Sequence, residues 1–239
     1  MLSWKRRLSV PSAVAIVLIA LLVCGGTALA ITGGVLDANR HPNVGSLVDA
    51  SRGTYCSGTL ISPTIFLTAA HCATDGSSVS VSFDPTYTSS SRLYSGTFQA
   101  DQYASAVVVF RRPIRGIAPA QLPTAGQLTN LPSNRRFTVV GYGQRQWPID
   151  LGPTRRVYAV TTLSSVSRAY LQLSTTAGSG GACYGDSGGP NFLGAGSTET
   201  DVIAGITSRG DQFCRYGYAA YRLDTPTARA FLGQYVRLP

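Results

Sequence analysis

Residues 185–190 read GDSGGP, and residues 67–72 read LTAAHC. In the first stretch, glycines surround Ser187 and let the backbone turn tightly, so that N–H groups can point at a developing negative oxygen. A serine hydroxyl is a poor nucleophile until a base takes its proton, and histidine is suited to that task near neutral pH. Each motif alone is commonplace. Together, 116 positions apart (187 − 71), they indicate nucleophilic catalysis with Ser187 as nucleophile and His71 as base.

The chain around these motifs is patterned as many short strands. It has 239 residues, of which 44% are hydrophobic and 13% charged, a composition that excludes a disordered chain. Short runs of β-branched and aromatic residues alternate with Gly, Pro, Ser or Asn, which is typical of sandwiches and barrels. One helix is expected at the C-terminus, where Asp224 or Thr225 can cap it and Pro226 suits its first turn. The candidate strands are 45–48, 55–61, 65–68, 79–83, 106–110, 137–142, 155–161, 170–173, 202–207 and 219–223.

The first thirty residues have the order of a secretory signal peptide. Lys5, Arg6 and Arg7 precede an uncharged apolar run at 13–23, and TALA at 27–30 supplies an A-x-A cleavage site. The run is shorter than the roughly 20 residues of a membrane span, although an uncleaved anchor is the alternative. Cleavage leaves 209 residues (239 − 30) and lowers the formal net charge from +9 to +6. We therefore expect a secreted protein without a stable membrane anchor.

The cysteines agree with export. Cys24 leaves with the signal peptide, and the even number that remains predicts two disulfides in an oxidising compartment. Counting does not choose among the three possible pairings. No C-x-x-C pair is present and the chain has only two histidines, so neither a zinc site nor a cofactor is expected. The remaining basic residues are arginines in short clusters without interleaved aromatics, which argues against a nucleic-acid partner.

Six stretches together resemble the trypsin/chymotrypsin-type serine proteases, in particular secreted, bacterial-style members. They are ITGG at 31–34, CSGTLI at 56–61, TAAHC at 68–72, VGYG at 140–143, GDSGGP at 185–190 and GITS at 205–208. The resemblance implies two packed six-stranded antiparallel β-barrels with a C-terminal α-helix. It places an N-terminal barrel at about 31–115, a linker at about 116–134, and a C-terminal barrel and helix at about 135–239.

The resemblance also assigns roles within the site. His71 would be the general base and Ser187 the nucleophile, with the backbone N–H groups of Gly185 and Ser187 forming the oxyanion hole. Ile31, freed by signal cleavage, would pair its new ammonium with Asp186. The implied disulfides are Cys56–Cys72 and Cys183–Cys214.

The substrate pocket implied by the resemblance has no charge at its base. Gly181 stands where trypsin-like relatives carry an Asp, six residues before the nucleophile. A buried substrate cation would there lack a partner, so cleavage after Arg or Lys is not expected. Arg209 replaces the Trp usual in the family. The pocket residues are Gly181, Ala182, Ser208 and Gly210.

The chain departs from the family at the third triad member. The family pattern resembles D-x-A-V-V, and the matching run here places Ala104 in the Asp position. Asp101 lies three residues upstream, a span of about 10 Å in extended chain. Two functions therefore stay open. The first is a monomeric secreted serine endopeptidase acting on protein or peptide substrates, impaired or rebuilt around Asp101. The second is a catalytically weak or inactive homologue that acts as a binding protein.

Overall fold

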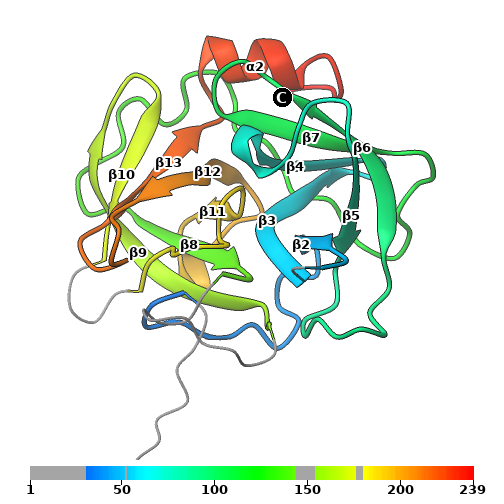
Figure 1. The fold of residues 1–239 in the computed structure, drawn as a ribbon. Helices are drawn as coiled ribbons and strands as arrows, with labels where there is room; N and C mark the ends of the chain where they lie inside the picture. Colours follow the sequence, from blue (N-terminus) through cyan, green and yellow to red (C-terminus); the bar gives the residue numbers. More distant parts are fainter. Residues whose placement is uncertain (1–30, 52, 144–153, 176–179) are drawn as a thin grey trace, which may run out of the picture.

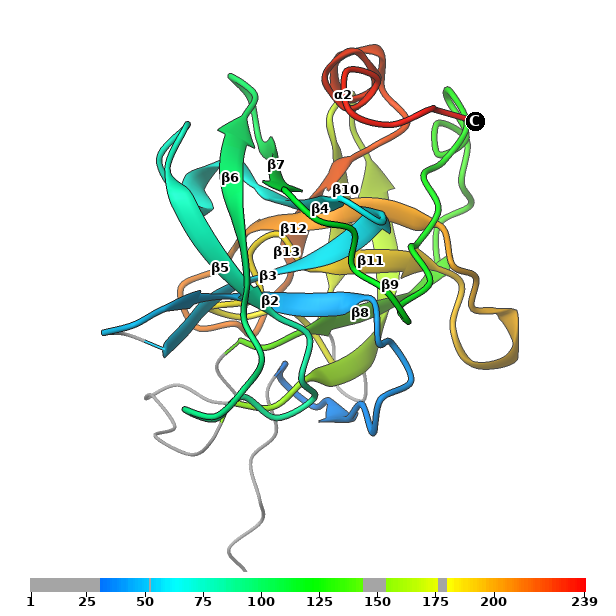
Figure 2. The ribbon, with the colours of Figure 1, turned by 90° about the vertical axis from the view of Figure 1, so that its right-hand side faces the viewer.

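Two β-barrels lie side by side, and a short C-terminal helix lies at one end of the pair (Figures 1 and 2). The structure is a computed structural model that describes residues 31–51, 53–143, 154–175 and 180–239. The predicted signal peptide falls outside these ranges. Within them, no helix is long and apolar enough to cross a membrane.

The first barrel is closed and antiparallel, with the strand order β2-β3-β4-β7-β6-β5. Its core is lined by β-branched and aromatic side chains such as Phe66 and Phe98, which are fully buried. Gly58 lets two strands approach closely, because a Cβ there would lie 2.4 Å from the Leu67 carbonyl oxygen. The strands are β2 Val44–Asp49, β3 Gly53–Ser62, β4 Ile65–Ala69, β5 Ser78–Ser82, β6 Tyr94–Ala100 and β7 Ser105–Phe110.

The second barrel is closed by pairing between β8 and β9, in the order β8-β9-β10-β13-β12-β11. Its strands are β8 Arg136–Gly141, β9 Val157–Val166, β10 Tyr170–Ser174, β11 Pro190–Leu193, β12 Ile203–Gly210 and β13 Tyr218–Arg222. The short strand β1 (Val35–Leu36) adds to β9 from outside the closed ring. The N-terminal segment therefore begins on the second barrel, whereas the sequence assigned all of 31–115 to the first.

The C-terminal helix α2 (Pro226–Leu232) closes the chain as the capping pattern predicts. The Thr225 side chain accepts a hydrogen bond from the Ala228 N–H (3.2 Å), and Pro226 occupies the first turn. Phe231 and Leu232 join a hydrophobic cluster that includes side chains from both barrels. The helix ends at Leu232.

Three strands had no counterpart in the sequence prediction: β1, β6 and β11. The β6 segment contains Ser, Gly, Thr and Gln among its seven residues, and β11 begins with a proline. The glycine within β6 and the proline that opens β11 are depleted in strands and weaken the sequence signal, while the closed barrels supply hydrogen-bonding partners on either side of both segments.

Candidate active site

His71 is presented by a single turn of 3-10 helix, η1 (Ala70–Cys72), directly after β4. The neighbouring Cys72 is bonded to Cys56 of β3, so the turn is tied to the barrel wall. Backbone hydrogen bonding also holds it, because the Ala70 N–H donates to the Ala104 carbonyl (2.9 Å). The imidazole stays partly exposed at the barrel surface.

Ser187 stands on a tight turn between the two barrels. Its carbonyl accepts a hydrogen bond from the Ser57 N–H (2.9 Å), and the Ser57 hydroxyl donates to the Gly185 carbonyl (3.0 Å). Gly188 has a φ of +81°, and a Cβ there would lie 2.2 Å from the Thr68 hydroxyl oxygen. The glycine is therefore required both by the turn and by the close approach of β4.

His71 and Ser187 line one cavity of about 370 Å³ between the barrels. The cavity is also lined by Ala182, Ser208 and Gly210, three of the residues predicted for the substrate pocket. Residues 116 positions apart in the chain thus face the same space. Its size is that of a pocket for a single small ligand or side chain.

The backbone N–H groups predicted to form an oxyanion hole have no hydrogen-bond acceptor among the described residues. Within the described ranges, the N–H groups of Gly185 and Ser187 donate to no protein acceptor. Gly185 has a φ of +89°, a conformation that glycine adopts without strain. Both groups are therefore free to donate to an oxygen bound beside Ser187.

His71 has no carboxylate partner among the residues that the structure describes. Partial burial lowers the pKa of His71 below the ordinary 6.5, and no charged group acts in the opposite direction. In a complete triad, a carboxylate fixes the imidazole tautomer and stabilises the imidazolium. His71 is consequently neutral at pH 7 but unsupported as a base.

Ala104, which the sequence pattern placed at the expected carboxylate position, lies beside the histidine turn, where its carbonyl accepts from the Ala70 N–H. The register between β4 and β7 pairs Ala69 with Ser105, and Ala104 precedes Ser105. Ala104 is 6% exposed and offers His71 only a methyl group.

Asp101 uses its carboxylate elsewhere. One oxygen accepts from the N–H groups of Tyr103 (2.6 Å), Ala104 (2.7 Å) and Ser105 (3.2 Å), and the other accepts from the Ser105 hydroxyl. Asp101 thus closes the turn between β6 and β7, and it lines a groove beside α2 rather than the cavity of His71. Its contacts are local, as is common for Asp in turns.

Two other carboxylates in the first barrel also accept hydrogen bonds from backbone N–H groups. Asp75 accepts from the Ala100 N–H (2.9 Å), and Asp84 accepts from the Arg92 N–H (3.2 Å). Neither lines the cavity of His71.

Asp186 is fully buried beside the nucleophile. Burial raises the pKa of its carboxyl to about 7, although hydrogen bonds from the N–H groups of Cys183 and Gly143 (2.8 Å each) act to lower it. Among the described residues, no cation neutralises it. The carboxylate is therefore costly in its charged form.

The N-terminal segment is docked onto the same region. Ile31 is fully buried in the core of the second barrel, and Thr32 exchanges backbone hydrogen bonds with Gly181 (3.0 and 3.1 Å). Ile31 has a φ of +58°, a strained conformation for a β-branched residue. That torsion exists only while the peptide bond to Ala30 is intact.

The predicted pocket base is arranged differently from the expectation. Gly181 does not line the cavity, and a Cβ on it would lie 1.9 Å from the Thr175 side chain. Tyr218 lines the cavity instead, is 4% exposed, and donates its hydroxyl to Asn191 (2.6 Å). The sequence carried no signal for this, because the β12–β13 register that pairs Gly210 with Tyr218 is a tertiary property.

Charged groups are present at the cavity wall. Asp211 accepts hydrogen bonds from four N–H groups of its own loop, those of residues 213 and 215–217. Burial raises the pKa of Asp211, but these bonds outweigh it and the net shift is downward. Arg209 is exposed, with its guanidinium 4.2 Å from the centre of the Tyr170 ring.

The cysteines form two bonds, Cys56–Cys72 and Cys183–Cys214, which are the pairs that the resemblance implied. The second bond ties the Ser187 turn to the loop that carries Asp211. A ring nitrogen of His71 and the sulfurs of Cys56 and Cys72 lie within 4.8 Å of one another. Because these sulfurs are joined as a disulfide, they are not thiolate ligands for a metal.

Comparison with known proteins agrees with this geometry. A family model described as Trypsin matches residues 31–228. A collagenase of Hypoderma lineatum is 27% identical over 176 residues, which cover 66% of this chain and 66% of the collagenase. The solved structure of HL collagenase superposes with a TM-score of 0.71 at 19% identity, covering 87% of this chain and 100% of that one. Human heparin binding protein superposes with a TM-score of 0.70 at 18% identity, covering 87% and 99%. At these identities the structural likeness concerns the fold.

Proposed function

The chain belongs to the trypsin family, and from that premise we propose that it is a secreted serine endopeptidase with low turnover. One observation carries the proposal: His71 and Ser187 line a single cavity beside two uncommitted N–H groups, while the described residues offer His71 no carboxylate. The groups that we propose as nucleophile, base and oxyanion donors thus lie around one cavity, and the described residues supply no carboxylate to support the base.

The chemistry follows from these groups. The Ser187 hydroxyl oxygen attacks the substrate carbonyl while a neutral His71 nitrogen accepts the hydroxyl proton. The carbonyl oxygen becomes an oxyanion that the N–H groups of Gly185 and Ser187 stabilise. The His71 proton then passes to the leaving amine, and water hydrolyses the acyl-enzyme by the same steps. Without a carboxylate the imidazolium is less stable, which costs on the order of 10⁴ in kcat.

The burial of Asp186 without a cation among the described residues supports maturation by cleavage after Ala30. The new ammonium of Ile31 would supply the cation that this carboxylate lacks, and cleavage would abolish the strained φ of Ile31. Ile31 is already buried in the core of the second barrel, and Thr32 is held to Gly181 by two backbone hydrogen bonds, which supports docking of the cleaved segment in this region. We expect the signal peptidase cut to replace a separate activating protease. N-terminal sequencing of secreted protein tests this, and a mature chain that starts elsewhere would refute it.

The pocket favours uncharged, apolar side chains of moderate size before the scissile bond. Gly181 has no side chain to supply a carboxylate. Ala182 and Gly210 are small, and the Tyr218 ring forms part of the cavity wall. Asp211 lines the cavity, and four backbone N–H groups of its own loop donate hydrogen bonds to its carboxylate. Cleavage profiles on a peptide library should show no preference for Arg or Lys, and a strong preference would overturn this pocket assignment.

Labelling with a serine-directed fluorophosphonate tests the proposed activity directly. The wild-type protein should form a covalent adduct on Ser187, slowly, and Ser187→Ala should form none. Mass mapping of the adduct identifies the residue. An adduct that persists in Ser187→Ala, or no adduct in the wild type at any pH, contradicts the proposal.

The second candidate is a binding protein without turnover, and the missing carboxylate favours it as well. One structural neighbour is named human heparin binding protein and another HBP, and the chain without residues 1–30 keeps a formal net charge of +6 (9 − 3). Heparin is therefore the ligand to test. Retention on immobilised heparin at physiological salt, together with no fluorophosphonate adduct, would favour binding over catalysis.

A further inference from the structure

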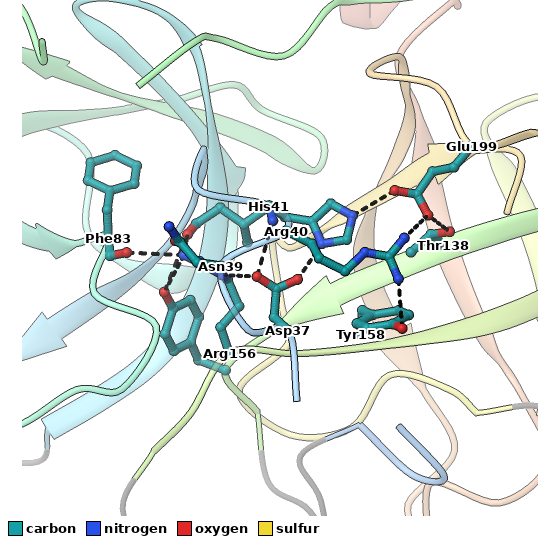
Figure 3. Close-up of polar contacts among 11 residues, drawn as sticks. Asp37, Asn39, Arg40, His41, Phe83, Thr138, Arg156, Tyr158 and Glu199 are labelled. Atoms are coloured by element: carbon teal, nitrogen blue, oxygen red, sulfur yellow. Dashed lines mark hydrogen bonds and ion pairs between the residues drawn. The ribbon is translucent and has the colours of Figure 1, made fainter. Parts of the chain in front are cut away.

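His41 is buried in a polar cluster far from the catalytic cavity (Figure 3). The cluster joins the N-terminal segment, which carries Asp37, Arg40 and His41, to the second barrel, which carries Arg156 and Glu199. His41 is 7% exposed, and its ring stacks on Phe192 with the centroids 5.4 Å apart. The proposed mechanism uses none of these groups.

Both ring nitrogens of His41 face carboxylates. Nδ1 is hydrogen-bonded to Asp37, and Nε2 lies 2.7 Å from a Glu199 oxygen. An ionised carboxylate only accepts hydrogen bonds, so both ring nitrogens must carry a hydrogen for both contacts to exist. The geometry therefore requires the positively charged imidazolium. A neutral ring would turn a lone pair toward one of the two carboxylates.

The charges around the ring are consistent with this state. Asp37 and Arg156 are fully buried, and the Arg156 guanidinium donates to Asp37 (2.8 Å). With Glu199, whose side chain is 16% exposed, these groups sum to −1, which a charged His41 brings to zero. Arg40 is half exposed, and its guanidinium nitrogen is 4.0 Å from Glu199, so this outer ion pair offsets the charge of Glu199 only in part.

The remaining titratable groups in the cluster are tyrosines. The Tyr158 hydroxyl accepts from Arg40 (2.7 Å), and its ring lies 5.8 Å from that of His41. The Tyr142 hydroxyl accepts from Arg156 (3.1 Å), and burial raises its pKa far above the ordinary value, so it stays neutral. Neither tyrosine adds a charge near neutral pH.

Asp37 is held in its charged form. Burial alone would raise its pKa, but the hydrogen bond and charge of His41 and the charge of Arg156 outweigh burial, and the net shift is downward. The Asp37 carboxylate also accepts a hydrogen bond from the backbone N–H of His41 (3.1 Å), and the backbone N–H of Asp37 donates to the Arg156 carbonyl (3.0 Å). These two bonds do not depend on the protonation of the ring. The Asp37–Arg156 contact thus persists when His41 loses a proton, and the Glu199 contact is the one at risk.

Glu199 is the link from His41 to the second barrel. It follows η2 (Gly196–Thr198), and its other oxygen accepts from the Thr138 hydroxyl on β8. Asp37 lies six positions after Ile31 (37 − 31), on the segment that docks Ile31 into the core. His41 and Asp37 therefore lie on the segment that carries Ile31, the residue that the proposed maturation pairs with Asp186.

We propose that His41 is a proton-dependent clamp, which holds the N-terminal segment against the second barrel while both ring nitrogens are protonated and loosens it when one proton is lost. His41 is in this sense a positioning residue for the docking of Ile31. The consequence for catalysis rests on the proposed function, but the clamp itself does not.

Hydrogen exchange measured by mass spectrometry tests the clamp without any catalysis. The protection of peptides covering 31–43 is compared at a series of pH values from about pH 5.5 to about pH 9.5, after correction for intrinsic exchange. Peptides from β4 serve as the reference for global opening. In the wild type, protection of 31–43 should fall at least about tenfold with rising pH, the scale of one hydrogen bond between charged groups.

Two variants separate a clamp from a merely structural histidine. Glu199→Gln is the matched control, because an amide can donate to the neutral ring nitrogen that a carboxylate repels. Its protection should stay high at the upper pH, where the wild type has lost it. His41→Gln should show low protection at every pH. Flat protection in the wild type, or the same pH dependence in Glu199→Gln, would overturn the proposal.

Fluorophosphonate labelling of the same two proteins connects the clamp to the site. The labelling rate of the wild type divided by that of Glu199→Gln should fall as pH rises. Because His71 is present in both proteins, its own pH dependence cancels in this ratio. If neither protein labels, the proposed function fails and the exchange result still decides the clamp. If both label but exchange is independent of pH, the clamp alone is wrong.

Discussion

The chain has two histidines, and their environments are opposite. His41 is buried between two carboxylates and stacked on an aromatic ring. His71 is partly exposed beside the nucleophile, and no carboxylate faces it within the described ranges. The carboxylate–imidazole pairing that supports a catalytic base thus occurs where the histidine is structural, and it is absent where the chemistry would take place.

The difference shows how closely histidine behaviour depends on its partners. Burial alone lowers the pKa of His71 and keeps the ring neutral, which leaves a lone pair for accepting a proton. Two carboxylates around His41 demand the charged ring, which can only donate. The environments thus suit one residue type to the two different roles proposed above, base at His71 and cationic link at His41.

The largest effect should come from giving His71 the partner that His41 already has. Ala104→Asp should raise kcat by roughly 10³–10⁴, with little change in KM, because the new carboxylate acts on the imidazolium of the transition state. Steady-state kinetics on a peptide ester measures both constants. Ala104→Asn, which matches the size but not the charge, is the control. Equal rates in the two variants would show that Ala104 is not the vacant carboxylate position.

Removing each histidine should separate structure from chemistry. His41→Leu removes the partner that Asp37 and Glu199 share and leaves a largely buried cluster with an uncompensated negative charge, so it should lower the free energy of unfolding by about 3–5 kcal/mol. His71→Leu removes a partly exposed ring without partners and should change it by about 0.5 kcal/mol or less. Urea denaturation followed by fluorescence compares the two. Equal losses of unfolding free energy in the two variants would contradict the contrast drawn between His41 and His71.

Asp101 should prove structural rather than catalytic. Asp101→Asn leaves the turn between β6 and β7 with a weaker acceptor for three N–H groups and a hydroxyl, so stability should fall by about 1–2 kcal/mol. The labelling rate of Ser187 should change less than twofold. Loss of labelling in a variant that remains folded by circular dichroism would instead identify Asp101 as the missing triad member.

The smallest effect concerns the pH profile of labelling. Acylation needs neutral His71, and partial burial places its pKa below the ordinary 6.5, so the rate should already be near its plateau at pH 7 and fall only in more acidic solution. Ala104→Asp should move the midpoint to higher pH, because a carboxylate favours the imidazolium. Glu199→Gln is used as background so that the His41 clamp does not contribute. A midpoint above 6.5 without the added carboxylate would contradict this assignment.

Much of the active site could be predicted because its motifs are local. The glycines around Ser187 reflect a turn and a close approach that only a residue without Cβ permits, and this requirement is visible in the sequence. His71 at the end of an apolar strand is equally local. The helix at Pro226 was predicted from its cap and spacing. The strands β6 and β11 were not, since barrel closure rather than composition makes them strands.

The sequence by itself predicted Ser187 as nucleophile and His71 as base and indicated the family, because these inferences rest on short local motifs. It also showed an alanine, Ala104, where the family pattern has its carboxylate. Only the tertiary structure decided what Asp101 binds, that Tyr218 rather than Gly181 lines the cavity, and that His41 meets Glu199 158 residues away. The physical reason is that a buried polar group takes whichever partner the packed barrels bring within hydrogen-bond distance, and chain spacing does not encode that proximity.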